Sequence, residues 1–422
     1  MPLPAWTPPT AIYTVGKELE LFPFSPGPPH GTTDHGRRPL PATLEAGHIR
    51  DFDTDEAKYI KTKATVRIEE VIRVEADRQS QIVRCKVLHA PMESRLNICP
   101  LTMSFKNKKK MPITRSVTLK AHDYEYYPGC IGAPWGNDEE ADANFSRECA
   151  VYQYFCDKGL CGYPHAIRQF YGGWVMKIER KDKDGNLKPR YVSLILTEYL
   201  YGYSIENLCY RKTDPGDPNR LGGEVTPDPY PVPFSKATGG VTHIKFDEEM
   251  RKLVMKKLLH SVVVGHHLGI QWRNLEPWNV FITMRNGNTD LDDLRVVIID
   301  HTNARVWHHT KWFKTEGAQV LTWLPYPHHP FERCSVDALV HFHGWWPPAY
   351  DPGVDRDRLF DDWLCSEEVF GPLEEAQEVV AELESRGIRE WPHLNPKFST
   401  FKTLDKLLED RREKDRKEKA EE

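Results

Sequence analysis

The sequence predicts an α+β fold with two lobes, a small β-rich N-terminal lobe and a larger, mainly helical C-terminal lobe. Five segments have the composition of strands and are separated by turn-like or helical stretches, at 65–74, 80–90, 116–123, 167–179 and 191–200. One helical segment interrupts these strands, and the strongest helical pattern of the chain follows them, at 246–269. Strands gathered ahead of the main helical region favour an α+β arrangement.

The spacing of apolar residues and the signals at helix ends support both helical segments. In the first segment, apolar residues recur every three or four positions, at Phe145, Cys149, Tyr152 and Phe155. The second segment has an acidic first turn, which suits the positive end of the helix dipole, and it ends at Gly269. Both segments are therefore predicted to be amphipathic helices.

Composition divides the chain into four parts. Residues 1–60 form a Pro- and Gly-rich extension, 61–200 the β-rich lobe, 201–400 the helical lobe, and 401–422 a charged tail. Within the helical lobe, a Pro- and Gly-rich stretch at 213–243 predicts a long loop.

Charge and cysteine content restrict the class of protein. The formal net charge of −5 argues against general coating of nucleic acid, although it leaves local basic patches open. The nine cysteines show no C-x-x-C pair, so we expect buried free thiols. The N-terminus lacks the pattern of a signal peptide, and no stretch is apolar enough to span a membrane. The expected location is the cytoplasm.

Four motifs in a fixed order resemble those of protein kinases. Lys120 ends the strand-like VTLK, and Glu148 lies in the helical SRECAVY. LILTEYLYG (194–202) resembles the hinge between lobes. WRNLEPWN (272–279) and the segment IIDHTN around Asp300 resemble the catalytic loop and the D-F-G segment. The chain is thus similar to the divergent kinase-like proteins common in fungi, where LKPWNVLI-type loops recur.

This resemblance implies a nucleotide site with a defined set of ligands. Lys120 would contact the phosphates of ATP, and Glu148 would orient that lysine by an ion pair. Asn279 and Asp300 would offer oxygen ligands to Mg²⁺. The implied cofactors are therefore ATP and Mg²⁺, with Lys120, Glu148, Asn279 and Asp300 as the binding residues.

The sequence departs from the kinase pattern at the positions implied to be catalytic. Asn274 stands where the resemblance implies an aspartate base, and an amide cannot accept the substrate proton. Glu276 replaces the usual lysine of that loop, and its carboxylate or that of Asp300 would be the remaining candidate base. Residues 66–88 contain no glycine, so a glycine-rich phosphate loop is absent.

Three functions are consistent with these departures. The first is a pseudokinase, or a transferase of another group, that binds nucleotide without ordinary kinase activity. The second is aminoacyl transfer from charged tRNA, resembling the fungal arginine-containing cyclodipeptide synthases, with basic patches at 106–110 and 411–419 contacting the RNA. The third is an atypical small-molecule kinase. No motif assigns a role to the His- and Trp-rich region 307–350.

Overall fold

The computed structural model describes ten ranges of the chain: residues 7–36, 63–90, 104–106, 109–111, 116–128, 136–181, 184–214, 217–311, 313 and 329–371. The predicted tail at 401–422 lies outside them. The chain divides into two compact units, each assembled from separate segments. Unit 1 contains Met1–Leu208, Pro231–Ile244 and Trp272–His309, and unit 2 contains Cys209–Tyr230, Lys245–Gln271 and Thr310–Glu422. The four domain ranges read from composition stay predictions.

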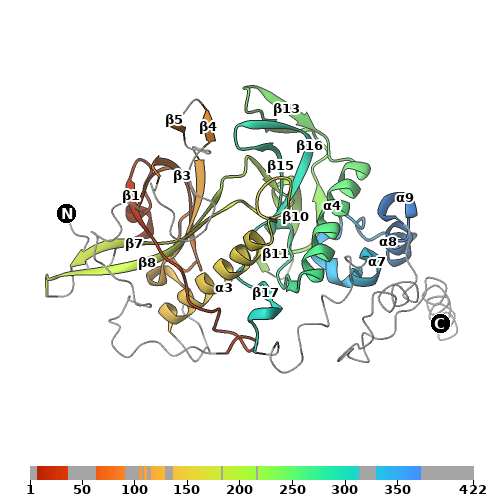
Figure 1. Cartoon of the computed structure of the whole chain (residues 1–422). Coiled ribbons are helices and arrows are strands. Elements are labelled where there is room, and N and C mark those ends of the chain that lie inside the picture. Colours follow the sequence, from red (N-terminus) through yellow and green to blue (C-terminus); the bar gives the residue numbers. More distant parts are fainter. Residues whose placement is uncertain are drawn as a thin grey trace, which may run out of the picture. The chain divides into compact units, whose positions relative to one another are not determined.

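Unit 1 is built on a closed barrel of antiparallel strands (Figure 1). The barrel strands are β1 (Glu18–Pro23), β2 (Ala64–Arg73), β3 (Gln81–His89), β6 (Ser116–His122), β8 (Leu187–Glu198) and β7 (Phe170–Lys181), in the order in which they pair. β7 also pairs with β1, which closes the barrel and leaves it without an edge.

Alternation of buried and partly exposed residues in the first part of β2 and in β3 turns one face of these strands into the barrel. In β2 the inward positions include Val66 and Ile68, and in β3 they include Val83 and Cys85. Together with residues of the other strands, such as Leu119, they form one hydrophobic core. Burial of this core is the main stabilising contribution to unit 1.

The helix α3 (Asn137–Asp157) packs against β6, β7 and β8 (Figure 1). Its face toward the barrel is unusual because it buries polar and charged side chains, among them Asn144, Arg147 and Glu148, next to Phe145. Buried polar groups need hydrogen-bond or ionic partners. Asn144 and the partners of Glu148 line one pocket, which is described below.

The rest of unit 1 consists of a small sheet, a hairpin and short elements. β9 (Gly202–Ser204), β15 (Val280–Asn286) and β16 (Thr289–Ile298) form a three-stranded sheet, and β12 (Val232–Ser235) pairs with β13 (Val241–Ile244). β4 (Ser104–Lys106) pairs with β5 (Lys109–Met111). The short elements are α1 (Pro9–Ile12), η1 (Tyr124–Tyr126), η2 (Glu206–Leu208), η3 (Pro277–Asn279), β17 (Arg305–Val306) and η4 (Trp307–His309).

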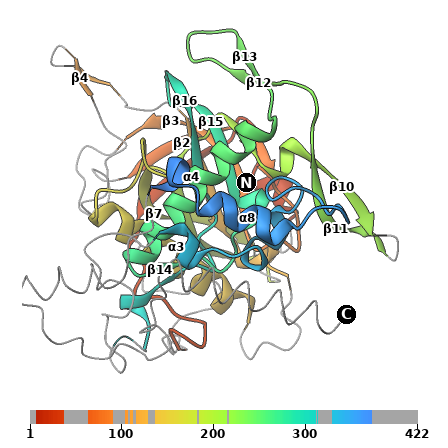
Figure 2. The same cartoon turned by 90° about the vertical axis from the view of Figure 1, so that its right-hand side faces the viewer.

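Unit 2 combines a hairpin with several helices, of which α4 is the longest among its described residues (Figure 2). Its elements are β10 (Cys209–Asp214), β11 (Asp217–Pro227), α4 (Glu248–His267), β14 (Ile270–Gln271), α7 (Pro330–Arg333), η5 (Asp337–Phe342), α8 (Arg356–Leu364) and α9 (Glu367–Phe370). α7 packs against both α4 and α8. No helix in the described ranges has the length and apolar character needed to cross a membrane.

The predicted two-lobed, protein-kinase-like fold with a mainly helical C-terminal lobe is wrong. The structure is rich in strands and centres on the closed antiparallel barrel. Among the helices in the described ranges, only α3 and α4 are longer than nine residues. Gly and Pro at 213–243 predict a loop, but the backbone there pairs in β10–β11 and β12–β13. Local turn signals fail here because hydrogen bonding between neighbouring segments satisfies the backbone.

The turn between β2 and β3 is fixed by its own side chains. Gln81 is fully buried, and its amide accepts a bond from the Glu75 nitrogen and donates one to the Glu75 oxygen, both 2.8 Å long. The Arg78 nitrogen donates to the oxygen of Tyr126 in η1 at 3.0 Å. Asp77 adopts a φ of +60°, the left-handed conformation that lets the chain reverse without a glycine. The turn therefore holds a defined shape.

Replacing Gln81 with Ala is expected to lower the free energy of unfolding by about 1–3 kcal/mol, because both backbone groups of Glu75 lose their partner. Urea denaturation measures this change. Gln153→Ala is the matched control, since the Gln153 amide contacts Asp157 in solvent and its loss should change stability by less than about 0.5 kcal/mol. Equal stability of the two variants would contradict the role of Gln81.

Candidate functional site

Lys120, Glu148 and Asp300 meet inside unit 1. The Lys120 ammonium lies 2.6 Å from Glu148 Oε2 and 2.9 Å from Asp300 Oδ1, and it donates to Thr302 Oγ1 at 3.2 Å. Lys120 comes from β6, Glu148 from α3, and Asp300 from the segment that follows β16. The structure thus brings together three of the residues singled out in the sequence, two of them as the ion pair that the resemblance implies. Their part in binding stays a prediction.

Each of these three groups stays charged at neutral pH. Burial would lower the pKa of Lys120, but Asp300 and Glu148 outweigh it and raise that pKa above its ordinary value. Burial would raise the pKa of Glu148 and of Asp300, but the Lys120 ammonium lowers both, that of Glu148 well below the usual range. One cation therefore holds two carboxylates in a largely desolvated place.

His122 completes the surroundings of Glu148. Its Nε2 lies 3.6 Å from Glu148 Oε2, and its Nδ1 lies 2.8 Å from the hydroxyl of Tyr127. Burial lowers the pKa of His122, and the nearby Lys120 lowers it further, so the imidazole is neutral at pH 7. His122 therefore adds polar contacts and no charge.

Asp300 is held in a strained backbone conformation. Its φ of +60° is uncommon for a residue other than glycine. The strain is stabilised locally, since Oδ1 accepts bonds from Lys120 and from the hydroxyl of Thr302, 2.7 Å away. Backbone strain of this kind is often retained at functional sites, which makes Asp300 a candidate functional residue on a second, independent ground.

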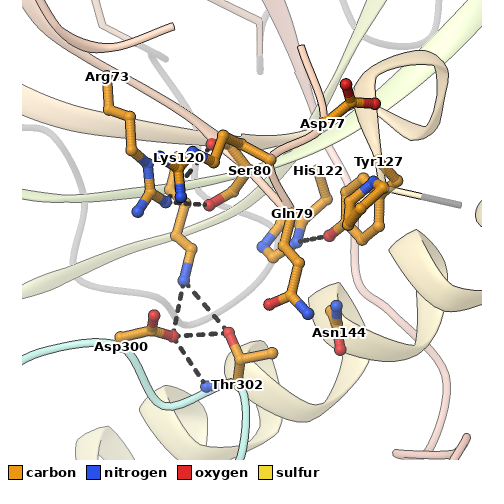
Figure 3. A pocket seen from close by; sticks show the side chains of 12 residues that line it. Arg73, Asp77, Gln79, Ser80, Lys120, His122, Tyr127, Asn144, Asp300 and Thr302 are labelled. Atoms are coloured by element: carbon orange, nitrogen blue, oxygen red, sulfur yellow. Dashed lines mark hydrogen bonds and ion pairs between the residues drawn. The ribbon is translucent and has the colours of Figure 1, made fainter. Parts of the chain in front are cut away.

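A polar pocket of about 280 Å³ lies beside the three charged groups (Figure 3). The residues that line it are Arg73, Asp77, Arg78, Gln79, Ser80, Lys120, His122, Tyr127, Pro128, Asn144, Asp300 and Thr302. The β2–β3 turn forms its roof, with Gln79 reaching down from it, and Lys120, Asp300, Thr302 and Asn144 form its floor (Figure 3).

Arg73 at the roof has bonding capacity that the protein leaves unused. One of its terminal nitrogens donates to Ser80 Oγ at 3.0 Å. The same nitrogen makes a longer bond, of 3.5 Å, to the backbone oxygen of Ser80. Its Nε is buried and has no hydrogen-bond partner, and no described carboxylate pairs with the guanidinium. An arginine in this state is a ready donor for an oxyanion.

Asn144 at the floor offers a second donor. The Asn144 side chain is 3% exposed, and its Oδ1 accepts from the Arg147 guanidinium, which can only donate. This contact fixes the orientation of the amide, so that Nδ2 is the atom left over. Nδ2 is buried and makes no hydrogen bond of good geometry, although the Tyr127 hydroxyl lies near enough to interact with it. Figure 3 shows it turned up toward the pocket.

Asn274, Glu276 and Asn279 do not line this pocket. The Asn279 amide nitrogen donates to the Asn274 oxygen at 3.1 Å, and the Asn279 backbone nitrogen donates to the Glu276 oxygen at 2.8 Å. The Asn279 backbone oxygen accepts from Ile299 at 2.8 Å. The structure therefore shows these residues shaping the loop that lies against the segment before Asp300.

Two contacts fasten this loop to its surroundings. The indole nitrogen of Trp272 donates to His301 Nδ1 at 3.3 Å, and His301 is neutral because burial lowers its pKa to about 4. Asp34 pairs with Arg273 at 2.8 Å and with Arg305 at 3.1 Å. Asp34, in the N-terminal segment, thus links the loop that contains Arg273 to the segment that follows Asp300 and contains Arg305.

The predicted Mg²⁺ ligands offer few oxygen atoms to a metal ion. Of Asn279 and Asp300, only Asp300 presents its side chain to the pocket, and its Oδ1 is already bonded to Lys120. Within the described ranges, no group of three or more His, Cys, Asp or Glu side chains is arranged to hold a metal. Mg²⁺ prefers six oxygens, so the residues present fit an ion only if a ligand or water supplies most of its shell.

The sequence did not point to Arg73, Gln79 or Asn144. The link at 75–79 predicts a hairpin turn and no more, although two arginines within six residues of a turn would have been a usable signal. Asn144 belongs to no motif recognised in the sequence. The basic patch at 411–419 lies outside the described residues, and the side chains of 106–110 are not described.

A scan of protein-family models and a search of curated proteins each found no match to this chain. Neither finding identifies the kinase-like family that the motifs resemble.

Replacing Lys120 with Met is expected to lower the free energy of unfolding by about 3–5 kcal/mol at pH 7, because Glu148 is left as a buried, unpaired carboxylate. The lowered pKa values of Glu148 and Asp300 stabilise the wild type above about pH 4, and this contribution fades as the pH falls. In the variant, burial raises the pKa of Glu148. The difference between the two proteins should therefore shrink from pH 7 to about pH 4.5 in urea denaturation.

Two further variants separate the charge effect from simple loss of a lysine. Lys86→Met, on the neighbouring strand β3, should change stability by less than about 0.5 kcal/mol. Adding Glu148→Gln to Lys120→Met should restore part of the loss, because the buried charge is then gone. A Lys120→Met protein as stable as the wild type at pH 7 would show that the ion pair contributes nothing.

Proposed function

We propose that this protein binds a small oxyanionic ligand in the Lys120 pocket, with phosphate-bearing molecules as the first class to test. The observation that carries the proposal is Arg73, a pocket-lining arginine with a buried, unpartnered Nε and no described carboxylate partner. Asn144 Nδ2 offers a second buried donor across the pocket. Buried donors without acceptors cost free energy, which an anionic ligand recovers when it binds.

The size of the pocket favours a compact ligand. Its volume of about 280 Å³ lies at the lower end of the range of about 300–1,000 Å³ that is typical of ligand sites. A phosphate, a pyrophosphate or a small metabolite fits this volume. A nucleotide would place its phosphate end here and extend its base beyond the pocket.

The titratable groups favour binding over phosphate transfer. Asp300 has a lowered pKa and a bonded Oδ1, which makes it a poor proton acceptor. His122 is buried against Glu148 and Tyr127. Asn274 and Glu276 lie outside the lining of the pocket. We therefore rank a binding or regulatory role in the cytoplasm above catalysis of group transfer.

Replacing Arg73 with Gln is expected to weaken binding of pyrophosphate and of ATP at least tenfold, because a hydrogen bond to a charged group contributes about 1.5–3 kcal/mol. Isothermal titration calorimetry at low ionic strength, with and without Mg²⁺, measures the dissociation constants. Arg84→Gln is the matched control, since Arg84 lies on the same hairpin, pairs with Glu70 at 3.1 Å and does not line the pocket.

Full-length protein that binds neither pyrophosphate nor ATP would contradict the proposal. Equal weakening by Arg73→Gln and Arg84→Gln would also count against it, because the effect would then come from general surface charge.

A further inference from the structure

The pocket has opposite charges at its two ends. At the floor, Lys120 carries one positive charge between the two negative charges of Glu148 and Asp300, which leaves the floor with an excess of negative charge. At the roof, Arg78 is paired with Glu75 at 2.9 Å, whereas Arg73 has no carboxylate partner among the described residues and supplies the positive charge. A simple anion is attracted to the roof and repelled by the floor. A ligand that fills the pocket must therefore present a positive group to the floor.

Asp300 has an oxygen available for such a group. The bonds from Lys120 and Thr302 all reach its Oδ1. Figure 3 shows the other oxygen, Oδ2, pointing away from Thr302 and up toward the pocket. The Asp300 side chain is 34% exposed, so Oδ2 is accessible to a ligand, whereas Glu148 is 2% exposed and is closed off behind Lys120.

From this charge pattern we infer that the ligand is a small zwitterion whose ammonium group binds Asp300 Oδ2 and whose carboxylate or phosphate binds Arg73. This inference rests on the proposed function, because it adds an amine to the oxyanion already placed at Arg73. Amino acids and aminoalkyl phosphates share this chemistry. Both are compact enough for a pocket of about 280 Å³.

Gln79 reaches down from the roof toward the floor, where Asn144 lies to the side of Asp300 and Thr302 (Figure 3). Amide side chains both donate and accept, so they are suited to the middle of a ligand whose ends carry opposite charges. Neither amide carries a charge that would oppose the ammonium or the oxyanion. The two amides thus add neutral contacts beside the charged ones.

The test compares pairs of compounds that differ in one amine. Phosphoethanolamine is compared with ethyl phosphate, and β-alanine with propionate, by calorimetry on the full chain in the absence of divalent metal. We expect the amine to tighten binding about tenfold or more within at least one pair, which corresponds to one charge-assisted hydrogen bond. The pair that shows the effect tells whether the anionic group is a phosphate or a carboxylate.

Asp300→Asn tests the position of the amine. Asparagine tolerates the left-handed backbone that Asp300 adopts, so this variant should keep the fold. It should reduce the preference for the amine to less than threefold while ethyl phosphate binds as well as before or better. Asp77→Asn is the matched control, because Asp77 also has a φ of +60° and also lines the pocket, but at the roof. It should keep the full preference.

The outcomes separate this inference from the proposed function. If wild-type protein binds none of the four compounds and no pyrophosphate, both fail. If ethyl phosphate and phosphoethanolamine bind equally and Arg73→Gln weakens both, the oxyanion site stands and the zwitterion is ruled out. If Asp77→Asn, and not Asp300→Asn, removes the preference, the amine lies at the roof. If tight binding of ethyl phosphate appears only with Mg²⁺, the positive group is a metal, and the inference is overturned.

Discussion

The ion pairs of Lys120 determine how the interior of unit 1 is arranged. A single ammonium holds a carboxylate from α3 and another from the segment after β16, so a barrel strand, a helix and a loop converge on one point. Burial of charges is favourable only when partners and geometry compensate for the loss of water. Removing Lys120 leaves both carboxylates without their cation, whereas removing either carboxylate leaves Lys120 paired with the other. The barrel core supplies most of the stability of unit 1, but these charges specify which polar segments face one another.

The β2–β3 turn holds the hydrogen-bond donors at the roof of the pocket in a fixed place. Gln81 closes the turn on Glu75, Arg78 is tied by its backbone to η1, and Asp77 takes the left-handed conformation. A glycine-rich turn would bring the backbone close to a ligand. This turn contains no glycine, so recognition falls to the side chains of Arg73 and Gln79. Side-chain recognition from a rigid turn favours a ligand of definite shape over a long polyanion.

The sequence predicted local features better than their assembly. The strand periodicity of 65–74, 80–90 and 116–123 appears as β2, β3 and β6, and the helical spacing around Phe145 appears as α3. Lys120, Glu148, Asn279 and Asp300 were singled out as one site; Lys120, Glu148 and Asp300 meet, whereas Asn279 does not line the pocket. The kinase-like fold was wrong because motif order carries no information on how strands close, and because the pairing of β10 with β11 depends on partners distant from the local signal. Asn144 and Arg73 were missed since their importance comes from unpartnered atoms, which only coordinates reveal.

The unpartnered donors also explain why a pocket with so few apolar walls would be retained. An unsatisfied buried donor costs about 1–3 kcal/mol, so Arg73 Nε and Asn144 Nδ2 make the protein less stable than a version with apolar residues at both places. Replacing such a group together with its bonded partner by apolar residues can be neutral or stabilising, so the fold itself does not require this cost. A ligand that accepts from both atoms converts the same cost into binding free energy and stabilises the folded chain by mass action. The unpartnered donors of this pocket therefore support the proposed binding of a ligand.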